Sequence, residues 1–87
     1  MKITFSLPMI RDLRKQFYLK QYDICRYIKV SDVAYRTWES RVRRPNDEHL
    51  ASLKKLFLLL DSHAIEVVDR QSALDILDRE FVLDGEE

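Results

Sequence analysis

Residues that interrupt regular structure are scarce in this chain. Its 87 residues include one glycine, Gly85, and two prolines, Pro8 and Pro45. Strict alternation of apolar residues, which is the pattern of a half-buried strand, extends no further than residues 3–7. These absences favour an all-α fold. A length of 87 residues suits one domain with a single modest core and is too short for two.

Cysteine and long apolar runs are equally scarce. Cys25 is the only cysteine, so an intramolecular disulfide is excluded. The first residues lack the uninterrupted apolar core of a secretory signal peptide. The longest apolar run, residues 56–60, is far shorter than the roughly 20 residues that a membrane span needs. We therefore expect a cytoplasmic protein with no membrane partner.

The sequence also lacks the patterns that accompany catalysis or metal binding. No nucleophile stands beside a candidate base, and there is no glycine-rich phosphate loop. His49 and His63 are far apart, and there is no second cysteine to complete a zinc site with them. We expect no enzymatic activity, no cofactor and no metal.

Net charge is absent from the whole chain but not from its halves. Residues 1–45 hold 11 Lys and Arg against 4 Asp and Glu, a net charge of +7, whereas residues 46–87 hold 4 against 11, a net charge of −7. This division predicts a basic surface for a polyanion and an acidic remainder that faces away from it. The alternative is a chance pattern of solvated helix faces.

Apolar residues at helical spacing predict three short helices in the first half. They cover residues 7–17, 21–28 and 32–40, and Ser31 is the expected N-cap of the third. A three-residue turn at 29–31 joins the second to the third, which is the arrangement of a helix-turn-helix unit.

The second half predicts one long apolar helix followed by a shorter one. Asn46 or Asp47 can cap a helix whose apolar stripe continues to Val68, either unbroken or with a break at residues 61–62. Ser72 resembles the start of a capping sequence that opens a last short helix. The whole chain therefore predicts five or six helices.

Residues 10–60 carry a series of motifs in a specific order and spacing. The motif residues are Leu19 and Gln21, Val30 and Ser31 with Tyr35 four residues on, and Trp38 and Glu39 before a basic loop that ends at Pro45. In this order the stretch resembles the phage Cro and repressor family of helix-turn-helix transcriptional regulators, also called the xenobiotic-response-element family. The resemblance implies a repressor-like DNA-binding domain over residues 1–61. It also implies a C-terminal helical extension, residues 62–87, in the same compact unit.

The resemblance places the third helix in the major groove of double-stranded DNA. Val30, Tyr35 and Trp38 then face inward. The residues that face outward, and that we expect to read bases, are Asp32, Val33, Arg36 and Thr37. Their chemistry suits this role, because arginine can bond to guanine, aspartate can accept from cytosine, and valine and threonine can touch a thymine methyl. Without the resemblance, an ordinary solvated helix face would be the better interpretation.

For other residues the resemblance implies contacts to the sugar-phosphate backbone or structural roles. The expected phosphate-binding residues are Gln21, Ser31, Arg41, Arg43 and Arg44. The alternative for the arginines is a basic solvated loop. Arg14 and Glu39 match a pair that joins the first helix to the end of the third, and we expect a structural ion pair. Cys25 takes a small core position of the family and is expected to be buried rather than reactive.

The chain departs from the family pattern at two positions. Lys29 and Arg41 stand where the family usually has glycine. If the backbone keeps a left-handed conformation there, each adds strain of roughly 1 kcal/mol. Otherwise the loop has another shape, and the phosphate contacts assigned to it change.

The second half has more apolar residues than a small monomer should bury. The expected dimerisation residues are Leu59, Ile65, Val68, Leu74, Leu77 and Phe81. A packed monomer in which they fold back onto the first helix is the alternative.

The function expected from these features is that of a homodimeric repressor that binds an inverted-repeat operator. One alternative is an antitoxin whose C-terminal segment binds a toxin protein while the first half binds DNA. A third possibility is an interaction domain that has lost DNA binding, against which the basic loop and the polar face of the third helix argue.

Overall fold

The structure is a computed structural model that describes residues 6–82, and over this range it consists of helices and their connections. The elements are a 3₁₀ turn η1 (Leu7–Met9) and the helices α1 (Ile10–Gln16), α2 (Gln21–Ile28), α3 (Asp32–Glu39), α4 (Asp47–Ser62) and α5 (Arg70–Glu80). The all-α prediction is confirmed. The predicted bounds of α2 are those observed, and the first predicted helix is divided into η1 and α1.

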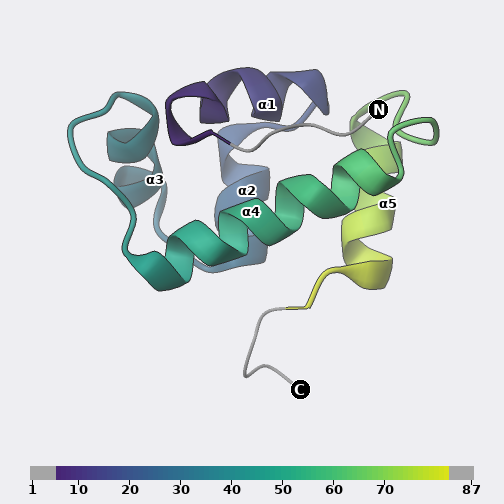
Figure 1. Cartoon of the computed structure of the whole chain (residues 1–87). Helices are drawn as coiled ribbons and strands as arrows, with labels where there is room; N and C mark the ends of the chain where they lie inside the picture. The colour runs from purple at the N-terminus through teal and green to yellow at the C-terminus, as the bar shows by residue number, and fades with distance from the viewer. Residues whose placement is uncertain (1–5, 83–87) are drawn as a thin grey trace.

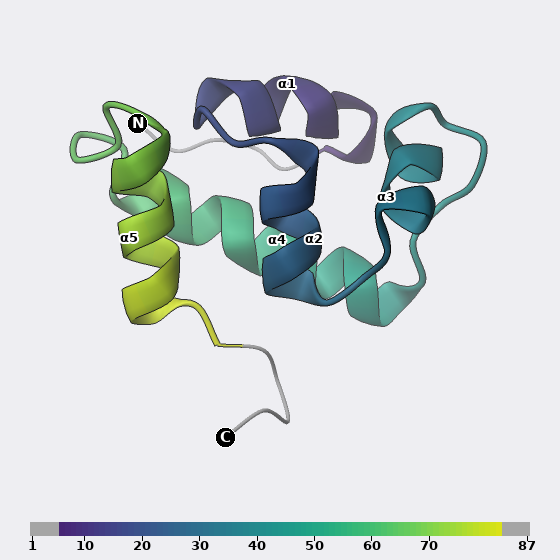
Figure 2. The ribbon, with the colours of Figure 1, turned by 180° about the vertical axis from the view of Figure 1, so that it is seen from behind.

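The long helix α4 organises the other elements. It crosses the molecule from the end where α3 lies to the end where α5 lies, and α1 and α2 lie between those ends (Figure 1). The view from behind shows α2 in front of the middle of α4 (Figure 2), and α4 packs against both α2 and α5. The fully buried side chains of α4 are Leu53, Leu56, Phe57 and Leu60. The apolar stripe of α4 therefore forms the centre of one shared core.

Side-chain caps set the starts of α3 and α4, as predicted. The Ser31 hydroxyl accepts a hydrogen bond from the Ala34 amide at 3.1 Å, and the Asn46 side chain accepts one from the His49 amide at 2.8 Å. Each cap satisfies an amide that has no partner within its own helix. Between the two candidates for the α4 cap, the structure selects Asn46.

The start of α5 differs from the prediction. Asp69, not Ser72, is the N-cap, and its carboxylate accepts from the Ser72 amide at 2.8 Å. The Ser72 hydroxyl in turn accepts from the Asp69 amide at 3.1 Å, which completes a reciprocal capping box. The stripe of α4 also ends at Ser62, so the alternative with a break is the observed one.

Polar contacts fix α5 to α2. Asp23 is buried on α2 and receives two hydrogen bonds from the Arg70 guanidinium, at 2.7 and 2.9 Å. Burial alone would raise the pKa of Asp23, but the hydrogen bonds from Arg70 and from the Lys20 amide lower it below its usual value. Tyr27 donates to Asp78 and stacks edge-on against Phe81, with ring centroids 6.3 Å apart. These contacts anchor both ends of α5.

Candidate nucleic-acid interface

The helices α2 and α3 pack against each other across the turn at residues 29–31 (Figure 2). Tyr35 and Trp38 point from α3 into the core, and their rings lie edge to face with centroids 5.7 Å apart. Val30 packs against the core from the turn. The predicted inward face of α3 is thus confirmed. Cys25 is buried beside this junction, and burial raises the pKa of its thiol to about 12. It is a core residue, as expected.

The opposite face of α3 is open to solvent over most of its length. Asp32, Val33 and Arg36 are exposed, as predicted for base-reading residues. Thr37 is only half-exposed, and its hydroxyl donates to the Ala34 carbonyl at 2.6 Å. Asp32, Val33 and Arg36 are therefore the more accessible part of this face.

An ion pair fixes the end of α3 to α1. Arg14 Nε lies 2.7 Å from Glu39 Oε2 and Arg14 Nη2 lies 3.2 Å from Glu39 Oε1, so the guanidinium holds both carboxylate oxygens. A third bond from Arg14 Nη1 to the Leu19 carbonyl, at 3.0 Å, joins the connection between α1 and α2 to the same group. Burial acts to raise the pKa of Glu39, but the hydrogen bonds from Arg14 and Gln21 outweigh it and lower the pKa. The predicted structural pair is confirmed.

Gln21 makes a hydrogen bond to the same carboxylate, a contact that the sequence did not reveal. Its side-chain amide donates to Glu39 Oε1 at 3.0 Å. One of its two amide hydrogens is used in this bond, and the other is left for an external acceptor. Gln21 is half-exposed at the first position of α2, where unpaired backbone amides and the helix dipole favour an anion.

A shallow recess of about 320 Å³ opens above these residues. Its lining residues are Arg11, Arg14, Gln21, Arg36, Glu39 and Ser40. Arg11 and Arg36 are exposed and come from α1 and α3 respectively. Because Arg14 already balances Glu39, these two guanidiniums give the recess a positive charge. Arg11 was not among the predicted residues, although its position three residues before Arg14 places both on one helix face.

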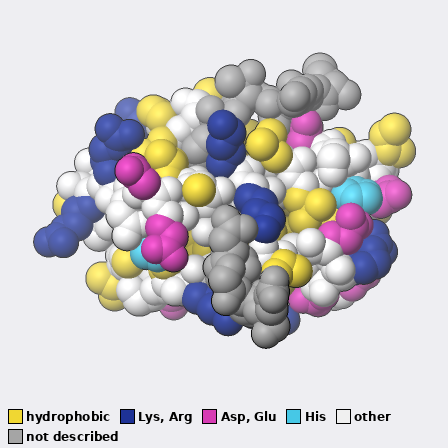
Figure 3. Space-filling model, turned by 60° about the horizontal axis from the view of Figure 1, so that its bottom comes forward, with side chains coloured by type: hydrophobic (Ala, Val, Ile, Leu, Met, Phe, Trp, Pro, Cys, Tyr) yellow, Lys and Arg dark blue, Asp and Glu magenta, His cyan; other side chains and the backbone are white. Residues whose placement is uncertain are grey.

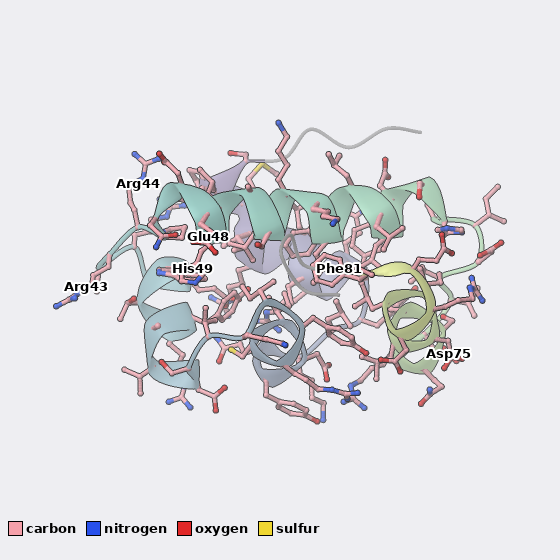
Figure 4. All side chains as sticks on the ribbon, turned by 90° about the horizontal axis from the view of Figure 1, so that it is seen from below. Arg43, Arg44, Glu48, His49, Asp75 and Phe81 are labelled. Atoms are coloured by element: carbon pink, nitrogen blue, oxygen red, sulfur yellow. The ribbon has the colours of Figure 1, made fainter. Side chains whose placement is uncertain are left out.

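The loop after α3 makes a second basic recess. A hollow of about 360 Å³ is lined by apolar Leu7, Pro8 and Trp38 and by Arg41, Arg43 and Arg44. All three arginines are exposed, and the Arg41 side chain donates to the Pro8 carbonyl at 3.2 Å. Arg43 and Arg44 extend away from the ribbon at the α3 end of the molecule (Figure 4). Ser31 is also exposed, although its hydroxyl oxygen already accepts the capping bond.

The backbone is left-handed at Lys29 and Arg41, the two positions where the family usually has glycine. Lys29 has φ 59° and Arg41 has φ 64°, so the loops retain the shape that glycine would allow and each non-glycine residue adds strain. Tyr18, which joins α1 to α2, has φ 63° and was not predicted to adopt this conformation. Among the backbone torsions of residues 6–82, these three are the positive φ values outside glycine.

The division of charge along the sequence is only partly a division in space. Glu48 lies at the start of α4, at the same end of the molecule as Arg43 and Arg44 (Figure 4). Acidic residues in the first turn of a helix stabilise the positive end of its dipole, which accounts for Asp47 and Glu48 at this position. The first acidic residues of the second half therefore lie close to the basic loop, and the orientation of the two halves toward a polyanion stays a prediction.

Two of the predicted dimerisation residues are core residues. Leu74 and Leu77 lie on the face of α5 that packs into the core, so they are not available to a second copy in this fold. Leu59 and Phe81 are partly buried against the core, whereas Ile65 and Val68 are exposed. The surplus of apolar residues inferred from the sequence is thus smaller than expected, because α5 packs on α4 and α2.

No family model, curated protein or solved structure matches the chain. The likeness to the Cro and repressor family therefore rests on the motif residues alone. Within residues 6–82 no helix is both long and apolar enough to cross a membrane. The same part of the chain contains no cluster of three His, Cys, Asp or Glu side chains suited to a metal ion.

Proposed function

We propose that the chain binds double-stranded DNA in a sequence-specific manner through α3 and acts as a homodimeric transcriptional repressor. One observation carries the proposal. The exposed face of α3 that holds Asp32 and Arg36 continues into a recess that Arg36 and Arg11 line, and the loop after α3 forms a second recess with Arg41, Arg43 and Arg44. A helix in the major groove needs base-contacting groups on its exposed face and backbone-contacting cations close to them.

The roles of the residues follow from their position. Arg36 offers a planar fork of donors to guanine O6 and N7, and Asp32 offers an acceptor to the cytosine amino group. Val33 supplies an apolar contact for a thymine methyl. Arg43 and Arg44 on one side, and Arg11 with the start of α2 on the other, neutralise phosphates and fix the register of α3.

The Arg14–Glu39 pair fixes the position of α3 in the free protein. It holds the last turn of α3 against α1, and Gln21 adds the first turn of α2 to the same group. A recognition helix that is already fixed loses less conformational freedom on binding.

A homodimer would supply the second recognition helix. A shallow, mostly apolar groove of about 520 Å³ lies along α4 and the end of α5. It is lined by Ala51, Leu58 and Leu59 together with Lys54, Lys55 and Glu80. Apolar residues with both charges at their edge suit a two-fold contact, because lysine of one copy can face glutamate of the other. Repression would follow if the bound dimer covers a promoter.

The DNA-binding proposal is tested by the salt dependence of binding to a labelled duplex of arbitrary sequence, measured by fluorescence anisotropy. Arg43→Ala and Arg44→Ala should each reduce the slope of log K against log salt by about 1. Arg79→Ala is the matched control, because this arginine is exposed on α5 at the opposite end. Unchanged slopes for both loop variants, or an equal change for the control, would contradict the proposed orientation.

The homodimer is tested separately by sedimentation equilibrium. Wild-type protein should sediment as a dimer at micromolar concentration, and Leu58→Asp should sediment as a monomer that keeps its helical circular dichroism. A wild-type monomer that binds a half-site as tightly as a full operator would show that the dimer is not required.

A further inference from the structure

The loop between α4 and α5 presents apolar side chains that the core does not use. Ile65 is 95% exposed and Val68 is 68% exposed, whereas Val67 between them is buried and anchors the loop. Single exposed apolar residues are common and need no explanation. Here two of them, three residues apart, lie on one short loop beside a hollow of about 360 Å³ formed by residues 61–66.

Hydrogen bonds hold this loop in one shape. The Glu66 and Val67 amides donate to the His63 carbonyl at 2.9 and 3.2 Å, and the Val68 amide donates to the Ser72 hydroxyl at 2.9 Å. The His63 ring lies between two carboxylates, 2.9 Å from Glu66 and 3.0 Å from Glu80. Ile65 is therefore held out in water by a structured loop, and a partner that covers it does not have to order the loop first.

The charged groups around these apolar residues are mainly acidic. Between Lys55 and Arg70 the sequence has no lysine or arginine, and its acidic residues are Asp61, Glu66 and Asp69. The arginines of α5 form ion pairs, Arg70 with Asp23 and Arg79 with Glu80, and Glu66 faces the His63 ring. In Figure 3, acidic side chains lie beside a histidine at the right-hand end, where Figure 1 shows α5 and this loop, and Lys or Arg is also present there. The exposed apolar side chains of the loop are thus flanked along the chain by the acidic residues Asp61, Glu66 and Asp69, which form its acidic rim.

We propose that residues 61–69, the end of α4 and the α4–α5 loop, are a docking surface for another protein, one that offers an apolar face with a basic rim. Charge complementarity selects this partner. A second copy of the chain would place the same acidic rims against each other across a two-fold axis, and DNA or an anionic membrane would be repelled. The loop lies at the end opposite α3 (Figure 1), so the partner leaves the proposed DNA-binding face open. The inference does not depend on DNA binding.

The test uses a short synthetic helical peptide of leucine and lysine, with the leucines on one face, as a stand-in for a basic partner. Amide signals of the isotope-labelled full chain are followed by NMR during titration with this peptide. We expect the shifted signals to come from residues 61–69, and Ile65→Ser to weaken binding by about tenfold. Val42→Ser is the matched control, because Val42 is 72% exposed on the basic loop at the other end, and it should bind like the wild type.

A second peptide with glutamate in place of lysine tests the charge. It should produce no shifts in residues 61–69, because its rim has the same sign as that of the loop. The proposal is overturned if both peptides bind equally, if the shifts fall along the α4 groove around Leu58, or if Ile65→Ser binds as tightly as the wild type. Ile65 makes little contact with the core, so this variant should keep its fold, which the undisturbed signals of α1–α4 would verify.

Discussion

Replacing Glu39 with glutamine removes the charge that balances Arg14 and leaves the side chain nearly the same size. The Arg14 and Glu39 side chains are 11% and 6% exposed, and the guanidinium holds both carboxylate oxygens. Loss of one partner of a buried pair costs about 3–5 kcal/mol, because the other charge stays buried without its counter-charge. Arg14 keeps its bond to the Leu19 carbonyl, so we expect Glu39→Gln to lower the free energy of unfolding by about 2–4 kcal/mol. This is a large part of the total of about 5–15 kcal/mol that is typical of a domain.

Urea unfolding measures this loss. Trp38 is the single tryptophan, lies in the core on α3 and reports on the packing of this helix. The matched control is Arg26→Gln, because Arg26 faces Asp78 at 3.6 Å with both side chains more than half exposed. An exposed pair contributes only about 0–1 kcal/mol, so the control should remain close to the wild type. If Glu39→Gln costs no more than Arg26→Gln, the Arg14–Glu39 pair does not hold α3 in place.

Three further predictions concern the same helix and its turns. The pKa of Glu39 is lowered in the folded protein, so its contribution to stability is complete above its ordinary value of 4.5 and is lost as the pH falls. The wild type should therefore lose more stability on acidification than Glu39→Gln, and parallel curves would contradict this. Arg36→Ala should lower discrimination at one base position by about 1–3 kcal/mol, and an equal loss on specific and random duplexes would rule out base reading. Lys29→Gly should raise the free energy of unfolding by up to about 1 kcal/mol, because it relieves a left-handed backbone, and a lower melting temperature would contradict the strain.

Local chemistry made much of the fold predictable. The bounds of α2 and the caps Ser31 and Asn46 depend on neighbouring residues, and the structure agrees with the sequence there. The start of α5 was placed late because Asp69 and Ser72 are both good caps three residues apart. In the structure they act together, Asp69 at the N-cap and Ser72 as the third residue of the helix.

Long-range packing explains what the sequence did not reveal. The sequence shows that Leu74 and Leu77 form an apolar stripe but not what covers it. The fold shows that both belong to the core of the same chain, where α5 packs against α4. The bond from Gln21 to Glu39 joins residues that are 18 positions apart, which no local pattern predicts. Arg11 enters the candidate site for the same reason, since α3 brings Arg36 to the opposite side of its recess.

Selection of duplexes from a random-sequence library by the purified full chain tests the central claim, sequence-specific DNA binding, most directly. Bound DNA is recovered at near-physiological salt over several rounds and sequenced, and Arg36→Ala is selected in parallel. We predict enrichment of two inverted half-sites with centres about 10–10.5 base pairs apart, and for Arg36→Ala the loss of preference at one base pair in each half-site. A wild-type selection that enriches no motif over the starting library would contradict sequence-specific recognition by α3.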